Sequence, residues 1–193
     1  LVGMLYNSQL MRYAGEDGIA AYGVLMYVGM IFNAIFIGYS VGTSPIVSYH
    51  YGAGNKQELK GLLKKSTIIT SVVAVFMLAT GELLSYPLSE IFVSYDAELL
   101  EMTRHAFKIY SLAFLLCGFS IYGSSFFTAL GNGLISALIA FLRTLVFQVA
   151  AVIVLPLLWG LDGIWWSIVA AEIMSVIVTS AFLIFERKKY GYL

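Results

Sequence analysis

Long apolar segments without charge are the feature that most constrains this chain. After Asp17 the next charged residue is Lys56, and no charge occurs between Lys108 and Arg143. Each stretch is longer than the about 20 apolar residues that a helix needs to cross the hydrocarbon core of a bilayer. Only 11% of the residues are charged and the mean hydropathy is +0.88, whereas a soluble domain carries about 25% charged residues. The sequence therefore predicts an all-α, polytopic transmembrane helix bundle.

Breaks in the apolar pattern divide the chain into six helical segments. The run Gly131–Gly133 interrupts one uncharged stretch, and Asp162 with Gly163 begins the last segment. We expect helices over about residues 1–13, 19–48, 62–84, 102–130, 134–158 and 163–186, which together form a single transmembrane lobe over residues 1–193. At about 1.5 Å per residue the first helix covers only part of a bilayer. We therefore expect it to be truncated.

Basic residues are concentrated after the second and the sixth predicted helix. They are Lys56, Lys60, Lys64, Lys65, Arg187, Lys188 and Lys189, and the opposite side receives Glu16, Asp17, Glu90, Asp96, Glu98 and Asp162. The positive-inside rule assigns the basic side to the cytoplasm. We therefore expect a multi-pass protein with a cytoplasmic carboxyl terminus, whose lysines touch the anionic head groups of the lipid bilayer.

The segment Gly38–Gly42 reads Gly-Tyr-Ser-Val-Gly, which matches the Gly-x-Ser-x-Gly pattern of serine hydrolases. That pattern needs a strand-to-helix turn and a later acid and histidine. Ser40 lies instead inside an apolar helical segment, and the only later histidines are His50 and His105, which we place on opposite sides of the membrane. We predict that Ser40 is not a nucleophile and that the chain is not an enzyme. An intramembrane hydrolase is the less favoured alternative.

The same glycines have the spacing that lets membrane helices approach closely. We expect Gly38 and Gly42 to serve helix packing and Pro45 to bend the helix, because proline removes one helical hydrogen bond. Gly131 and Gly133 are expected to separate two helices.

Cys117 is the only cysteine, and neither histidine has a metal-binding spacing, so we predict no metal and no cofactor apart from a transported coupling ion. The eleven basic and eleven acidic residues cancel, which argues against a nucleic-acid partner.

Four motifs resemble, in order and spacing, those of the multidrug and toxic compound extrusion (MATE) family. They are "GEDGIAAYGV" (15–24), "GYSVGTSPIVSYHYGAGNKQELK" (38–60), "ALGNG" (129–133) and "GLDGIWWSIVAAE" (160–172). Members have twelve helices in two six-helix lobes. The resemblance implies the carboxyl-terminal lobe of the bacterial branch that exports lipophilic cations, with the amino-terminal lobe upstream.

The resemblance also implies a function. The expected protein is a proton- or sodium-coupled antiporter of the bacterial inner membrane that works by alternating access. A lipid or polysaccharide flippase of the same superfamily is the alternative, although only Arg143 lies within the spans to bind a pyrophosphate. A non-transporting membrane subunit is a further alternative. One branch of the family uses an acid in its tenth helix, but residues 109–130 contain none.

Polar residues at mid-membrane depth are candidates for function. Glu172 is the clearest, and Ser175 and Thr179 share its helical face, so we take the three as coupling candidates; the alternative is a structural carboxyl group. We expect Arg143 to extend to the cytoplasmic surface. Together with many aromatic residues, five polar residues are candidates to line a cavity for flat lipophilic cations: Asn7, Asn33, Ser111, Tyr122 and Gln148.

Overall fold

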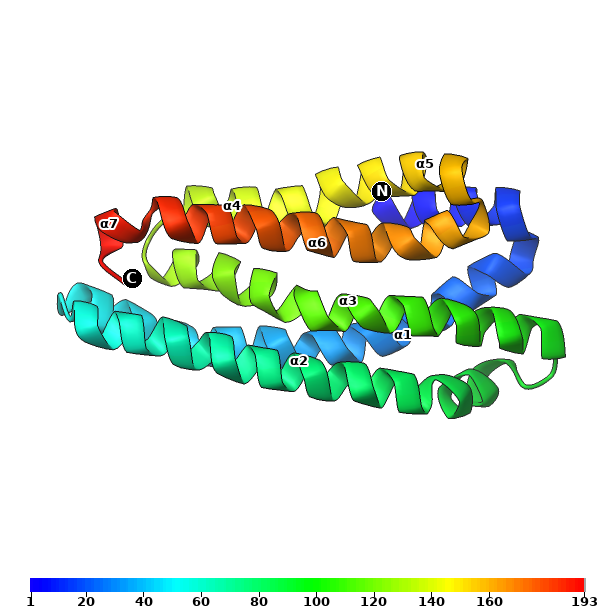
Figure 1. Cartoon of the computed structure of the whole chain (residues 1–193), viewed down its shortest axis with the longest axis horizontal. Coiled ribbons are helices and arrows are strands. Elements are labelled where there is room, and N and C mark those ends of the chain that lie inside the picture. Colours follow the sequence, from blue (N-terminus) through cyan, green and yellow to red (C-terminus); the bar gives the residue numbers. More distant parts are fainter. Residues whose placement is uncertain (193) are drawn as a thin grey trace.

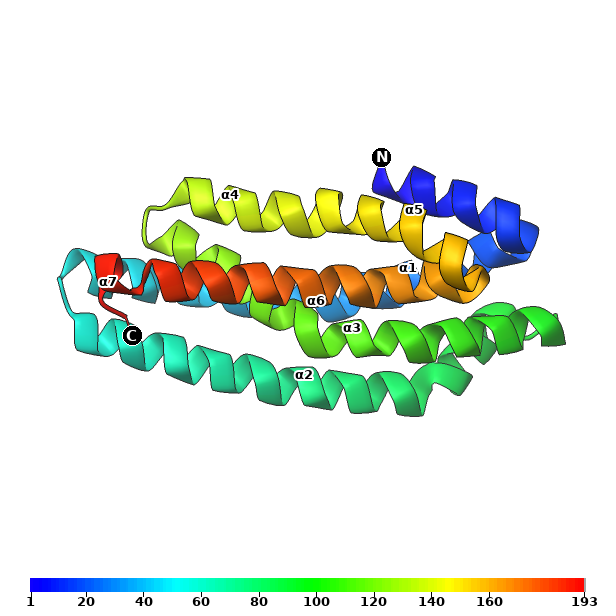
Figure 2. The same ribbon diagram turned by 45° about the horizontal axis from the view of Figure 1, so that its top comes forward.

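The protein is a bundle of long helices in a computed structural model that describes residues 1–192. The elements are α1 (Val2–Gly52), α2 (Lys56–Val93), α3 (Ala97–Ala129), α4 (Gly133–Phe141), the π-helix η1 (Leu142–Phe147), α5 (Gln148–Trp159), α6 (Leu161–Phe185) and α7 (Arg187–Tyr190). The long helices run along one common direction (Figures 1 and 2). Five stretches are long and apolar enough to cross a membrane. The predicted all-α transmembrane class is confirmed.

The helix α1 is bent at Gly15. This glycine has φ 65° and ψ −148°, a conformation that other residues rarely adopt. The two predicted helices, 1–13 and 19–48, are therefore the two arms of one bent helix. The first arm folds back against α6, where the Tyr6 hydroxyl lies 2.8 Å from the Ser167 hydroxyl. In Figure 1 the dark blue arm lies beside α5 and α6.

Polar caps extend α2 and α3 beyond the predicted ranges. The Asn55 side chain accepts a hydrogen bond from the Glu58 N–H at 3.2 Å, so α2 begins at Lys56. Asp96 accepts bonds from the N–H groups of Glu98 and Leu99, and α3 begins after it. Hydropathy alone marks the apolar centre of such helices and misses these capped, polar first turns.

The helix α3 is the centre of the bundle and packs against α1, α2, α4 and α6. Glycines allow its closest approaches to α1. A Cβ atom at Gly29 would overlap the Tyr110 hydroxyl, and one at Gly118 would overlap the Phe36 ring. Close helix approach through small residues is therefore present, but at positions other than the predicted pair.

The predicted packing role of Gly38 and Gly42 is not found within this chain. Both are exposed, and a Cβ atom added to either would have no neighbour within 4 Å. The break in α1 lies at Gly15, and α1 continues as a helix through Pro45 to Gly52. Proline fits helical φ and removes a single hydrogen bond, so one proline need not end the helix.

The predicted helix 134–158 contains a π-helical segment. The turn at Gly131, with φ 75°, ends α3, and the Asn132 side chain caps α4 by accepting from the Ile135 N–H at 3.3 Å. After α4 the chain winds through η1 before α5. Such π-helical turns are rare and occur frequently at functional sites, and hydropathy does not reveal them.

A buried ion pair as the candidate functional site

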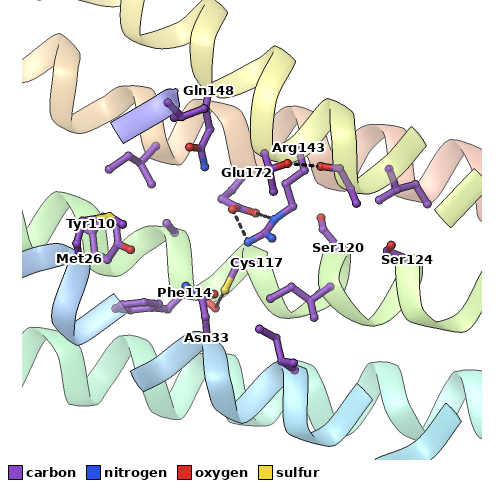
Figure 3. A pocket seen from close by; sticks show the side chains of 18 of the residues that line it. Met26, Asn33, Tyr110, Phe114, Cys117, Ser120, Ser124, Arg143, Gln148 and Glu172 are labelled. Carbon is purple, nitrogen blue, oxygen red and sulfur yellow. Dashed lines mark hydrogen bonds and ion pairs between the residues drawn. The ribbon is translucent and has the colours of Figure 1, made fainter. Parts of the chain in front are cut away.

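Arg143 and Glu172 form a two-point ion pair inside the lobe. The Arg143 Nε donates to Glu172 Oε2 at 3.0 Å, and Nη2 lies 2.8 Å from Oε1. Arg143 comes from η1 and Glu172 from the middle of α6 (Figure 3). Glu172 is 3% exposed. A planar guanidinium matches a carboxylate in this fork geometry, so the pair is a neutral unit in a buried setting.

This pair corrects the expectation that Arg143 extends to the cytoplasmic surface. Its side chain is only 17% exposed and is turned toward α6. An arginine at this depth is costly unless it is paired, and a carboxylate of the next helix provides the partner.

The sequence contains a signal for this pairing. Counting from the turn at Gly160, Arg143 lies 17 residues back and Glu172 lies 12 residues forward. At about 1.5 Å per residue the two levels differ by about 8 Å, which a long arginine side chain can span. One acid and one base at similar depth in neighbouring antiparallel helices therefore predict an ion pair.

The ion pair lies on the wall of a cavity of about 530 Å³. Apolar and aromatic side chains form most of the wall, among them Tyr22, Met26, Tyr110, Phe114 and Ile168. Polar side chains also reach it: Asn33, Ser120, Ser124, Thr144 and Gln148. Two of the cavity candidates from the sequence, Asn33 and Gln148, thus lie beside the ion pair (Figure 3).

Two polar atoms at this wall are buried without a hydrogen-bond partner. They are the Oδ1 atom of Asn33 and the hydroxyl of Ser120, and the Ser120 side chain is completely buried. Buried polar groups normally have partners, so each such atom calls for an explanation. A polar wall with free acceptors next to an ion pair can bind a ligand or an ordered water.

The other three cavity candidates lie elsewhere. Asn7 lines a neighbouring groove of about 670 Å³ between the two arms of α1. Ser111 is completely buried between α2 and α3, where its hydroxyl donates to Glu82 Oε1 at 2.5 Å. Tyr122 is 3% exposed and packs against Tyr39 with ring centroids 6.0 Å apart. Neither Ser111 nor Tyr122 therefore lines this cavity.

The face of α3 that lines the cavity differs from the predicted face by one residue. The predicted face includes Ser111 and Tyr122, but the cavity contains Tyr110 and Ile121, each one position earlier. One residue along an α-helix is a rotation of about 100°. Ser111 and Tyr122 thus face other helices, whereas Tyr110, Phe114, Cys117, Ser120 and Ser124 of α3 line the cavity.

Ser175 and Thr179 continue the Glu172 face of α6 but do not contact the ion pair. Both side chains are buried, and neither hydroxyl has a hydrogen-bond partner. The Thr179 methyl group occupies the space that a Cβ atom would need at Gly123 of α3. These two residues therefore pack α6 against α3, and Arg143 is the partner of Glu172.

Ser40 lies in a groove lined by hydroxyl groups rather than in a nucleophile elbow. It belongs to the continuous helix α1, and its hydroxyl is buried without a partner. The hydroxyls of Ser44 and Ser125 lie 2.9 Å apart and link α1 to α3. His105 pairs with Asp162 at 2.9 Å. The strand, turn and base of a nucleophile elbow are absent from the described residues around Ser40.

The hydroxyl groove adjoins the cavity of the ion pair. It has a volume of about 540 Å³ and shares Ile37, Ile121 and Ser124 with that cavity. The groove extends from these residues along α1 and α3 to Ser48 and Ala129, where the Ser48 hydroxyl donates to the Ala129 carbonyl at 2.9 Å. A groove that carries several hydroxyl groups therefore runs from the cavity of the ion pair toward the lysine-rich end of the bundle.

Comparisons with known proteins agree on one family. The sequence profile of the MatE family matches residues 1–154. The multidrug export protein MepA of Staphylococcus aureus (strain bovine RF122 / ET3-1) is 25% identical over 182 residues, which cover 94% of this chain and 39% of MepA. MepA of Staphylococcus haemolyticus (strain JCSC1435) is 26% identical over 174 residues.

Solved structures show the same fold. The outward-facing conformation of a multidrug resistance MATE family transporter of the MOP superfamily superposes with a TM-score of 0.91 at 21% identity, covering 100% of this chain and 43% of that protein. A MOP superfamily transporter from Pyrococcus furiosus gives a TM-score of 0.86 at 20% identity and is covered to 42%. The chain thus spans less than half the length of these relatives.

Proposed function

We propose that this chain, which belongs to the MatE family of transporters, forms one lobe of a two-lobe, cation-coupled drug antiporter. The two MepA relatives are called multidrug export proteins, and the chain covers 39% of the Staphylococcus aureus protein. A lobe of this kind would alternate access with a second lobe around a midplane cavity. The observation that carries the proposal is the Arg143–Glu172 pair on the wall of an aromatic cavity.

The ion pair gives Glu172 a role in coupling by exchange of partners. Because Arg143 contacts both carboxylate oxygens, a proton, a sodium ion or a lipophilic cation that binds Glu172 competes with the guanidinium. The displaced guanidinium cannot lose its proton, and an unpaired charge in the membrane is costly. Occupation of Glu172 therefore favours a conformation in which Arg143 reaches water or another anion.

The cavity wall suits substrates that are flat, apolar and cationic. Tyr22, Tyr110 and Phe114 line it beside the carboxylate. Aromatic faces attract cations, and apolar walls bury an organic ring system. The π-helical turn that carries Arg143 supplies the local irregularity that a moving side chain needs.

The distribution of charge supports the proposed orientation. Seven basic residues lie at one end of the bundle: Lys56, Lys60, Lys64, Lys65, Arg187, Lys188 and Lys189. The positive-inside rule places this end in the cytoplasm. For a bacterial efflux protein the membrane is then the inner membrane, with drugs entering from the lysine-rich side.

Drug export by the full-length protein in proteoliposomes tests this proposal. Imposed proton or sodium gradients should accelerate export by the wild type, and Glu172→Gln combined with Arg143→Gln should abolish that acceleration. The double variant leaves no unpaired charge, so its folding is preserved while the exchange is lost. Asp162→Asn, at an exposed ion pair of the same helix, is the control and should keep gradient dependence. Wild-type gradient dependence in the double variant would remove the pair from the mechanism.

A further inference from the structure

An apolar groove lies at the lysine-rich end, on α3 between the start of α2 and the end of α6. Its volume is about 440 Å³. The walls are Leu63 and Ile68 of α2 and Leu183 and Ile184 of α6, and Phe119 of α3 lies between them. The ends of α2 and α6 that form it lie at the same end of the bundle in Figures 1 and 2. This groove is separate from the cavity of the ion pair, with which it shares no lining residue.

The interior of the groove offers little to a polar ligand. The Thr67 hydroxyl donates to the Leu63 carbonyl at 2.8 Å, so its proton is already used within α2. Ser180 is the other hydroxyl of the lining. Ile68 and Ile184 are 53% and 52% exposed at the rim. An apolar chain that entered the groove would cover these side chains.

Two lysines stand at the end of the groove nearest to the helix ends. Lys60 and Lys64 are one turn apart and share their helical face with Leu63, Thr67 and Ile68. Both lysines are exposed, and neither forms an ion pair in the described part of the chain. From residue 60 to residue 68 the helix rises about 12 Å. The groove is thus cationic at its mouth and apolar along its length.

The surroundings of the mouth reinforce its positive charge. Besides the two groove lysines, this end carries Lys56, Lys65 and the basic run 187–189, but only two acids, Glu58 and Glu186. One of these acids is already used, since Glu186 Oε2 lies 3.4 Å from Lys189 Nζ. A negatively charged head group therefore meets an uncompensated positive surface here.

We propose that this groove is a binding site for an anionic phospholipid. One acyl chain lies along Leu63, Phe119 and Leu183, and the phosphate group lies between Lys60 and Lys64. In the leaflet at this end of the bundle, the lysines of the mouth lie on the side of the lipid head groups. The apolar interior of the groove lies on the side of the acyl chains. Basic pockets between transmembrane helices recognise anionic head groups in this way, and apolar burial holds the chain.

Native mass spectrometry of the full-length protein tests the site directly. The protein is equilibrated with equal amounts of phosphatidylglycerol and phosphatidylcholine of identical acyl chains, and the bound lipids are counted. The wild type should retain phosphatidylglycerol preferentially. Lys60→Gln with Lys64→Gln should lower that preference about 30-fold, because each lysine near anionic lipid contributes about 1 kcal/mol and 1.4 kcal/mol is tenfold.

Two further variants separate the head group from the chain. Ser180→Trp fills the groove and should reduce retention of both lipids, whereas Lys65→Gln removes a neighbouring charge outside the groove and should lower the preference much less than the loss of Lys60 and Lys64 does. Unchanged thermal unfolding in detergent verifies that the variants fold. Equal retention of the two lipids by the wild type, or an equal effect of Lys65→Gln and the groove lysines, overturns the proposal. Retention of no lipid by the wild type also overturns it and assigns the groove to protein contacts.

Discussion

The helix α6 contributes a carboxylate to two side-chain pairs in contrasting surroundings, one with an arginine and one with a histidine that is charged only when protonated. In the middle of the helix, Glu172 is 3% exposed and receives both contacts from Arg143. In the first turn, Asp162 lies 2.9 Å from His105, and about half of each side chain is exposed, 52% and 54%. Water solvates and screens the outer pair, whereas the charges of the inner pair depend on each other.

The difference shows that burial decides how much the exchange of a carboxylate's partner costs. Exchanging the partner of Asp162 moves a charge between protein and water, which changes the free energy little. Exchanging the partner of Glu172 leaves a buried guanidinium without compensation, which changes the free energy by several kcal/mol. Of the two pairs, the inner pair therefore has the larger change in free energy when the partner of its carboxylate is exchanged.

The largest effect is expected from breaking the inner pair on one side. Glu172→Leu should destabilise the protein by about 3–5 kcal/mol because Arg143 is left buried and unpaired. The midpoint of thermal unfolding and the folded yield in detergent measure this loss. Glu172→Leu combined with Arg143→Leu should recover most of it. Equal instability of the single and the double variant would show that the carboxylate has a role in folding independent of its charge.

An intermediate loss is expected from Glu172→Gln. A carboxyl group without a charged partner would tolerate an amide of the same shape. With Arg143 paired to both oxygens, the amide leaves a charge without its partner. Glu172→Gln should therefore lose stability, although less than Glu172→Leu, because its carbonyl still accepts one hydrogen bond.

A medium effect is expected from Arg143→Lys. Lysine keeps the positive charge but lacks the planar fork that makes two contacts at once. The loss of one hydrogen bond to a charged group is worth about 1.5–3 kcal/mol, which thermal unfolding should detect. Arg104→Lys is the matched control, because Arg104 makes one exposed contact of 3.5 Å with Glu101. If both changes cost the same, the fork geometry contributes nothing to the inner pair.

The fold was predictable from the sequence where apolar length determines it. Uncharged runs longer than a bilayer can only be helices in lipid, and the five spanning stretches follow from them. The break at Gly15 falls in the interval between the predicted helices 1–13 and 19–48, whereas the π-helix η1 was not predictable in the same way. Its geometry depends on the helices packed around it, and an apolar run carries no such information.

The site was predictable in its residue types and less so in its geometry. Glu172 was identified because burying a carboxylate at that depth of the membrane costs free energy. Asn33 and Gln148 were identified because polar side chains at that depth carry a similar, smaller cost. The cavity face of α3 was misplaced by one residue. Buried residues occur around α3 rather than on one side of it, so its sequence has no single apolar stripe that marks its orientation. Orientation of such a central helix depends on its neighbours.

A small effect is expected from the outer pair. Asp162→Asn should cost about 0–1 kcal/mol, as exposed ion pairs do, and high salt should reduce the cost because exposed charges are screened. Asp162 also lies in the first turn of α6, where a negative charge favours the helix dipole. His105→Gln removes the pair but keeps that charge. A loss larger than that of Glu172→Leu, in the same unfolding assay, would refute the comparison.

The smallest effect is expected where α6 continues beyond Glu172. The hydroxyls of Ser175 and Thr179 are buried without partners, so their removal breaks no hydrogen bond and relieves the cost of a buried polar atom. Thr179→Val keeps the shape that packs against Gly123, and Ser175→Ala leaves little empty space. Both variants should unfold at the wild-type temperature or slightly above it and should export with normal gradient dependence. If Thr179→Val instead abolishes that dependence while the protein stays folded, its hydroxyl binds the ion together with Glu172. The coupling site would then extend along α6, and the ion pair with Arg143 would be only one of its two parts.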